Sequence, residues 1–167
     1  MTRQLWAPWR LEYIGEAGTQ EGCVFCAEAA GELGEQSLAV HRGEQGFVLL
    51  NKFPYASGHL MVASMRHLAE LSDLTRDEAA ELHDLTTKSI AALRAVYSPH
   101  AFNVGWNLGQ VAGGSIAAHL HEHVVPRWSG DTNFMPVLAD VKVVPEHLIT
   151  TRDRLREAWP GLTERLA

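Results

Sequence analysis

The chain has 167 residues, of which 46% are hydrophobic and 20% are charged, and its formal net charge is −6. This length and composition predict one globular domain with a substantial core. The negative balance argues against broad binding to nucleic-acid backbones, although it allows a small nucleotide in a local pocket. The N-terminus lacks the apolar core of a signal peptide, and no apolar run reaches the ~18 residues of a membrane span. We therefore expect a cytoplasmic protein with no membrane contact.

The first twenty residues differ in character from the rest. Trp6 and Trp9 flank Pro8, a pattern that does not form a regular element. We expect residues 1–20 to form an N-terminal arm whose aromatic side chains pack on the body of the protein or on a partner subunit. Residues 21–167 are then expected to form a single domain.

Strands dominate the centre of the chain. We predict five of them from apolar runs bounded by Gly, Pro and polar residues, at 38–41, 46–51, 59–64, 101–107 and 118–127. The first two are expected to form a hairpin through residues 42–45. Cys23 and Cys26 lie in a turn that leads into a short helix ending near residue 30.

The clearest helical signal follows the third predicted strand. Thr75 and Glu78 have the spacing of a capping box, and apolar residues recur behind them at helical intervals. This pattern predicts a helix over about 76–97 that ends before Ser98-Pro99. One or two further helices are expected between 145 and 159. A sheet with one long helix among its strands and others at the ends indicates an α+β fold, with an antiparallel sheet covered by helices.

The stretch from His119 to Arg127 carries the main chemical signal. His119, His121 and His123 alternate, so on a strand their rings would share one face at intervals of roughly 6–7 Å, with Glu122 facing away. Just upstream, residues 103–109 and 113–115 supply amides, backbone N–H groups and a hydroxyl. Metal binding and chemistry on a phosphate are both open readings of this arrangement. A strand with surface histidines would leave the strict alternation unexplained.

Histidine is the best candidate nucleophile. The sequence has no G-x-S-x-G elbow and no P-loop, and its only cysteines are Cys23 and Cys26. A neutral imidazole can attack phosphorus and form a phosphoramidate. His121 is best placed for this attack, because another histidine stands on each side of it. The backbone at Gly113-Gly114-Ser115 could hold the same phosphate.

A metal site competes for some of these residues. Cys23-x-x-Cys26 supplies two thiolates, and a structural zinc site needs two further ligands, for which His59, His67 and His119 are candidates. In a cytosolic protein this cysteine spacing indicates metal binding or redox chemistry rather than a structural disulfide. The remaining histidines are expected to be surface residues: His41, His83, His100 and His147.

The run from His119 to Val125 resembles the signature of the histidine triad family, His-x-His-x-His followed by two apolar residues. The resemblance extends over most of the chain, through Asn51, Gly58-His59, His67, residues 103–107 and residues 113–115. Residues 5–10 and 125–134 make the chain most similar to the bacterial branch that contains diadenosine tetraphosphate phosphorylases.

The resemblance implies an α+β fold, a homodimer whose two sheets join, and nucleotidyl transfer through a nucleotidyl-histidine. It assigns His121 as the nucleophile and His123 and His59 as residues that hydrogen-bond the phosphate or the nucleophile. It implies substrate binding by five residues: Asn51, Asn107, Gly113, Gly114 and Ser115. It implies a structural zinc held by Cys23, Cys26, His67 and His119. Between Asn107 and His119 the chain is one residue longer than the common pattern, which leaves the role of Ser115 open.

Several functions remain compatible with the resemblance. Phosphate as acceptor makes the chain a phosphorylase of diadenosine polyphosphates, which we favour, and water makes it a hydrolase. A nucleoside phosphoramidate hydrolase and a nucleotide-binding scaffold are further alternatives. The presence of all four histidines, His59, His119, His121 and His123, favours an enzyme. A purely redox or zinc-binding module would leave His121 and His123 without a role.

Overall fold

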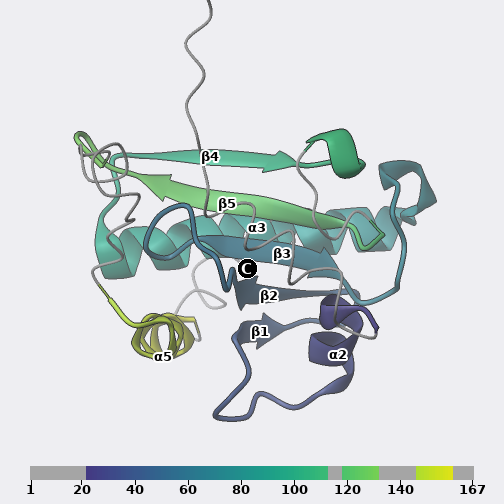
Figure 1. The fold of residues 1–167 in the computed structure, drawn as a ribbon, viewed down its shortest axis with the longest axis horizontal. Coiled ribbons are helices and arrows are strands. Elements are labelled where there is room, and N and C mark those ends of the chain that lie inside the picture. The colour runs from purple at the N-terminus through teal and green to yellow at the C-terminus, as the bar shows by residue number, and fades with distance from the viewer. Residues whose placement is uncertain (1–21, 113–117, 132–145, 160–167) are drawn as a thin grey trace, which may run out of the picture.

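The computed structural model describes residues 22–112, 118–131 and 146–159. The expected N-terminal arm, the Gly113-Gly114-Ser115 segment and residues 132–145 lie outside these ranges. The described residues form the predicted α+β fold. Its five strands make an antiparallel sheet in the order β1-β2-β3-β5-β4 (Figure 1). Their bounds are Ala39–Arg42 for β1, Gly46–Leu50 for β2, Leu60–Ser64 for β3, Ala101–Trp106 for β4 and His121–Arg127 for β5.

The helices are α2 (Val24–Ala30), α3 (Arg76–Tyr97) and α5 (Leu148–Ala158). Short 3₁₀ turns occupy Leu71–Asp73 and Gln110–Ala112. Helix α3 has the predicted bounds and the predicted capping box, in which Thr75 and Glu78 bond each other's backbone N–H. Within residues 146–159, the described part of the C-terminal region, there is one helix, and His147 caps it by accepting from the N–H of Ile149. In the described residues, no helix combines the length and apolar character that a membrane crossing requires.

Alternation along the strands divides the core into two layers. Val48, Leu50, Leu60, Val62 and Val124 face the side covered by α3 and α5, where they join Leu82, Leu85, Leu93 and Leu155 in one cluster. Figure 1 shows α3 crossing behind the sheet. The intervening residues Phe47, Leu49, Met61 and Ala63 face the other side, where they pack with Phe25 of α2. The catalytic candidates of β5 lie on this second side, since His121 pairs with Ala63 and His123 with Met61.

The two edges of the sheet differ. At the β1 edge, Arg152 Nη1 donates to the carbonyls of Glu35 at 2.5 Å and Ser37 at 2.9 Å. Arg156 donates to the carbonyl of Ala39 through Nε at 2.9 Å and Nη2 at 2.6 Å. At the β4 edge, by contrast, Val104 keeps 43% of its surface exposed. Helix α5 therefore covers one edge with arginines, while β4 presents an apolar side chain to solvent.

One strand begins later than expected. The histidine strand was predicted from about residue 118, but β5 begins at His121. The N–H of Leu120 donates to the carbonyl of Leu68 at 2.6 Å, and its carbonyl accepts from Ser64 N–H at 3.4 Å. Residues 119 and 120 are thus hydrogen-bonded to the end of β3 and to the loop after it, and the regular strand begins one residue later.

Candidate functional site

The first cluster of functional side chains joins three separate segments. Cys23 caps the start of α2, and Cys26 lies in its first turn. His67 comes from the loop after β3, and His119 precedes β5. One donor atom from each of these four residues lies within 4.8 Å of all the others. This is the set that the family resemblance implied. His59, the third candidate ligand, lies elsewhere.

The distances within this Cys–His cluster fit a common centre. Nδ1 of His119 lies 3.4 Å from Cys23 Sγ and 3.6 Å from Cys26 Sγ, and Nδ1 of His67 lies 3.2 Å from Cys26 Sγ. Zinc bonds of about 2.0–2.3 Å in a tetrahedron place neighbouring ligands roughly 3.3–3.8 Å apart. The Nε2–H of His119 donates to the carbonyl of Ser64 at 2.8 Å, which leaves the Nδ1 lone pair directed at the cysteines. Burial lowers the pKa of His119, favouring the neutral form that binds metal.

The second cluster contains His121, His123 and His59. Nδ1 of His121 lies 2.7 Å from the backbone carbonyl of His119. A carbonyl can only accept, so Nδ1 carries the proton and the lone pair of the neutral ring is on Nε2. The ring is buried, and burial lowers its pKa. His121 is thus held in the tautomer that presents a nucleophilic Nε2.

A chain of hydrogen bonds fixes the tautomer of His123 in the opposite sense. The N–H of Tyr55 donates to His59 Nδ1 at 3.1 Å, so the proton of His59 is on Nε2. That Nε2–H donates to His123 Nδ1 at 2.9 Å, which places the proton of His123 on its own Nε2. Burial, followed by the nearby His121, lowers the pKa of His123 to about 4. His123 is therefore a neutral donor.

Two asparagines complete this arrangement. The amide of Asn107 meets His123 Nε2 at 3.1 Å through Nδ2, and a half-turn of the amide brings its oxygen to the protonated nitrogen. Asn51 is buried beside His59, with Nδ2 3.4 Å from His59 Nδ1 and Oδ1 accepting from Phe53 N–H at 2.9 Å. In this structure the Asn51 side chain thus supports the loop that orients His59. The part played by the Tyr55 backbone has no signal in the sequence.

The triad histidines do not form one evenly spaced row. His119 belongs to the Cys–His cluster, whereas the rings of His121 and His123 lie 5.0 Å apart, closer than the strand spacing predicts. Glu122 faces away, as expected, and accepts from the Thr86 hydroxyl of α3 at 2.6 Å. The prediction that His41 is a surface residue was wrong, because His41 is half-buried in β1. Its ring stacks on that of Trp159, with the two ring centroids 4.8 Å apart.

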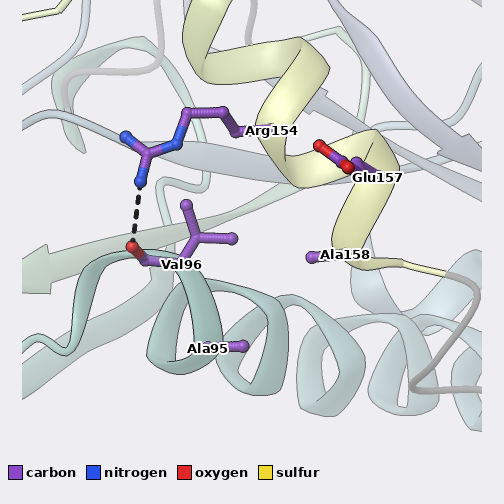
Figure 2. Close-up of a pocket in the computed structure, with 5 residues that line it drawn as sticks. All are labelled: Ala95, Val96, Arg154, Glu157 and Ala158. Carbon is purple, nitrogen blue, oxygen red and sulfur yellow. Dashed lines mark hydrogen bonds between the residues drawn. The ribbon is translucent and has the colours of Figure 1, made fainter.

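A hollow of about 270 Å³ lies away from both clusters, between α3 and α5. Its lining residues are Ala95, Val96, Arg154, Glu157 and Ala158 (Figure 2). The guanidinium of Arg154 crosses it to donate to the carbonyl of Val96 at 3.3 Å. None of the histidines or cysteines of the two clusters is among the lining residues.

The fold and the paired histidine clusters define a histidine triad protein. The family model of the HIT domain matches residues 34–130, more than half of the chain, so the chain belongs to this family. A relative from Mycobacterium tuberculosis named AP-4-A phosphorylase is 44% identical over 164 residues, which cover 94% of this chain and 84% of the relative. An uncharacterised HIT-like protein from Mycoplasma pneumoniae is 33% identical over 67% of this chain and 76% of its own length.

Solved structures agree on the fold. A zinc-bound histidine triad family protein from Mycobacterium smegmatis matches with a TM-score of 0.69 at 24% identity, covering 86% of this chain and 97% of that one. A HIT family protein from Bacillus subtilis matches with a TM-score of 0.60 at 26% identity, covering 88% and 99%.

Proposed function

We propose that this protein is a nucleotidyl transferase that cleaves diadenosine polyphosphates through a nucleotidyl-His121 intermediate, with phosphate as the acceptor. The observation that carries the proposal is the pair of opposed tautomers. His121 directs a lone pair, and His123 directs a proton, from neighbouring positions on β5. A nucleophile beside a neutral donor suits attack on a phosphate ester. The similarity to a protein named AP-4-A phosphorylase supports this substrate class.

The reaction proceeds in two displacements. His121 Nε2 attacks the α-phosphorus, a P–N bond forms, and the bond from that phosphorus to the bridging oxygen breaks. From diadenosine tetraphosphate the leaving group is ATP, and AMP stays on His121. In the second step an oxygen of inorganic phosphate attacks the same phosphorus, the P–N bond breaks, and ADP leaves. The carbonyl of His119 stabilises the positive charge that His121 acquires, because it accepts its Nδ1–H.

The donors around the phosphate are assigned on the same basis. His123 keeps its proton at Nε2 because His59 donates to its Nδ1 at 2.9 Å. In this structure Asn107 accepts a hydrogen bond from that Nε2–H, and in the proposal an oxygen of the reacting phosphate replaces Asn107 as the acceptor. Asn107, next to His123, contacts the same phosphate in this proposal. The expectation that Asn51, Gly113, Gly114 and Ser115 contact the substrate remains a prediction.

We also propose that Cys23, Cys26, His67 and His119 hold a structural zinc. All four positions of a tetrahedron are supplied by protein, which leaves no place for a substrate or reactive water. Bound there, zinc would cross-link α2, the loop after β3 and the start of β5. The protein is further proposed to be a homodimer joined through β4.

Product analysis tests the reaction. Diadenosine tetraphosphate is incubated with and without phosphate, and we expect ADP plus ATP only when phosphate is present. AMP plus ATP at equal rates under both conditions would instead identify a hydrolase. Failure to cleave the dinucleotide at all would favour a phosphoramidate hydrolase or a nucleotide-binding scaffold, which nucleoside phosphoramidates would distinguish.

The nucleophile is tested by His121→Ala, with His83→Ala of the exposed face of α3 as the matched control. We expect His121→Ala to fold, keep its metal and bind nucleotide, yet to lose more than the roughly 10²–10³-fold in turnover that removal of one donor costs. Intact-mass spectrometry should detect an AMP adduct in the wild type and in His83→Ala alone. Near-normal turnover of His121→Ala would overturn the mechanism.

A further inference from the structure

Phe25 occupies one of the two positions between the cysteines of the Cys–His cluster, on α2. Its side chain is 1% exposed. The ring centroid lies 5.1 Å from that of His119 and 4.6 Å from that of His121, with interplanar angles of 36° and 31°. The ring therefore contacts one ligand candidate of the cluster and the proposed nucleophile. Neither the metal proposal nor the reaction proposal gives this side chain a role.

The contacts of His121 show what such a ring can contribute. The bond from Nδ1 to the His119 carbonyl, at 2.7 Å, fixes one edge of the imidazole. A single hydrogen bond still allows the ring to tilt about that contact. Phe25 packs beside the ring at an angle of 31°, and His123 meets it edge-on at 75° and 5.0 Å. The two neighbours together restrict the tilt that would move Nε2.

The direction of Nε2 matters because the lone pair must align with the phosphorus and the leaving oxygen. Reacting groups need to be held within about 0.5 Å and 10–20° of the productive geometry. A displacement of about 1 Å can cost 10²-fold in rate. The ring beside the nucleophile is thus well placed to influence turnover without contacting the substrate.

We propose that Phe25 is a positioning residue that holds the His121 imidazole in line for attack, a role that rests on the function proposed above. Cys23 and Cys26 flank Phe25 closely in sequence, so anchoring both thiols fixes the α2 turn that carries the ring. The Cys–His cluster is thereby connected to His121 by two contacts, one from the His119 carbonyl and one from the Phe25 ring. A displacement of the Cys–His cluster would therefore also displace the His121 ring.

Phe47 provides the matched control. It lies in the same apolar cluster and is fully buried, and its ring centroid lies 6.5 Å from that of Phe25. Among the aromatic contacts of the described residues, none joins Phe47 to His119 or His121. Phe25→Leu and Phe47→Leu therefore remove similar apolar surface from one core, and only the first removes the contact with the nucleophile.

The experiment compares the two variants and the wild type by steady-state kinetics, metal content and proton NMR. For Phe25→Leu we expect kcat to fall about 10–100-fold, with KM within twofold (about 0.4 kcal/mol) and metal content unchanged. The downfield resonance of the His121 Nδ1 proton should broaden, because the looser ring exchanges that proton faster. Phe47→Leu should lower the melting temperature and leave both kcat and the resonance near those of the wild type.

Equal losses of kcat in the two variants, or an unchanged resonance in Phe25→Leu, would overturn the proposal. If Phe25→Leu does not fold, Phe25→Met replaces it, since Met fills irregular apolar space. Failure of both variants to fold would make Phe25 a residue of the core alone and would also overturn the proposal. The resonance does not depend on turnover, so it tests the position of His121 even if the wild type fails to cleave diadenosine tetraphosphate.

Discussion

His119 and His121 are linked by a hydrogen bond that serves both clusters. The Nδ1–H of His121 donates to the carbonyl of His119 at 2.7 Å, while the ring of His119 faces Cys23 and Cys26. One residue thus supplies a ring to the Cys–His cluster and a carbonyl to the proposed nucleophile. The alternation of histidines brings the two functions together at the start of β5.

The metal proposal predicts an unusual effect for an exposed residue. Substitutions of exposed side chains usually change stability by less than about 0.5 kcal/mol. His67 is exposed, yet we expect His67→Ala to lose the metal and to melt markedly lower. A loss of even about 3 kcal/mol, a fraction of what zinc contributes in small domains, lowers Tm by roughly 6–12 °C.

The measurement combines elemental analysis with thermal melting in protein purified without chelators. His83→Ala, at an exposed histidine of α3, serves as the control and should keep the wild-type values. About one zinc per chain is expected in the wild type and in the control. A wild type without zinc, or a His67→Ala variant that melts like the control, would refute the metal proposal.

The hydrogen-bond chain through His59 predicts that different substitutions of this residue lower kcat by different amounts. His59→Leu removes the donor to His123 Nδ1, and it also removes the ring nitrogen that accepts from the Tyr55 N–H. With the tautomer of His123 no longer fixed, we expect a loss of kcat approaching the roughly 10²–10³-fold that a missing donor costs. His59→Gln retains a donor and an acceptor and should recover part of that loss.

Steady-state kinetics with metal content as a control measure this effect. The metal should remain in both variants, because His59 is not part of the Cys–His cluster. If His59→Leu and His59→Gln lose the same activity, donation to His123 is not what His59 contributes.

The lowered pKa of Glu78 predicts how the stability of the fold depends on pH in the acid range. Hydrogen bonds from Arg66, at 2.5 and 2.8 Å, and from the Thr75 backbone lower the pKa of Glu78 from 4.5 to about 2. A carboxylate with a lowered folded-state pKa stabilises the fold fully above its unfolded pKa. That contribution declines as the pH falls from about 4.5 through about 2.

The check is urea unfolding of the wild type and Glu78→Gln across the acid range. The difference in the free energy of unfolding should be constant between neutral pH and about pH 5.5 and should shrink below about 4.5. Release of metal at low pH affects the wild type and Glu78→Gln alike, so it cancels in the difference between their free energies of unfolding. A difference independent of pH would show that the Glu78 carboxylate is not selectively stabilised in the folded state.

The dimer proposal places β4 at the interface. A charged residue on an edge strand opposes pairing with another strand, so Val104→Lys should convert a dimer to a monomer at micromolar concentration. Because Val104 is 43% exposed, the change should cost the single chain little. Val111→Lys, at another exposed valine, is the control and should remain dimeric. Sedimentation of the wild type as a monomer would refute the proposal directly.

Local patterns predicted much of this fold. The capping residues Thr75 and Glu78 and the apolar repeat behind them set the bounds of α3 because they act within the helix itself. The alternation of residues along β5 likewise placed Glu122 on the face opposite the histidines. The family resemblance identified the four members of the Cys–His cluster, which spacing alone had left among three histidine candidates.

What the sequence could not predict depends on contacts between distant segments. Leu120 pairs with Leu68, and that pairing delays the start of β5. The tautomer of His123 depends on a backbone N–H at Tyr55, a group that every residue except proline possesses. His41 is half-buried because Trp159, at the far end of the chain, stacks on it. None of these contacts can be recognised from a local pattern in the sequence.

The arginines of α5 also determine how far a sheet built from this chain can grow. Arg152 and Arg156 occupy carbonyls before and at the start of β1, so a strand approaching that edge would have to displace their hydrogen bonds. Among the strands that the structure describes, only β4 offers its edge for addition. Association through β4 is therefore self-terminating, because after one copy has joined another the two outer edges are both β1. Helix α5, which packs against the core, thus also opposes the addition of further copies at β1 and the open-ended growth of fibrils.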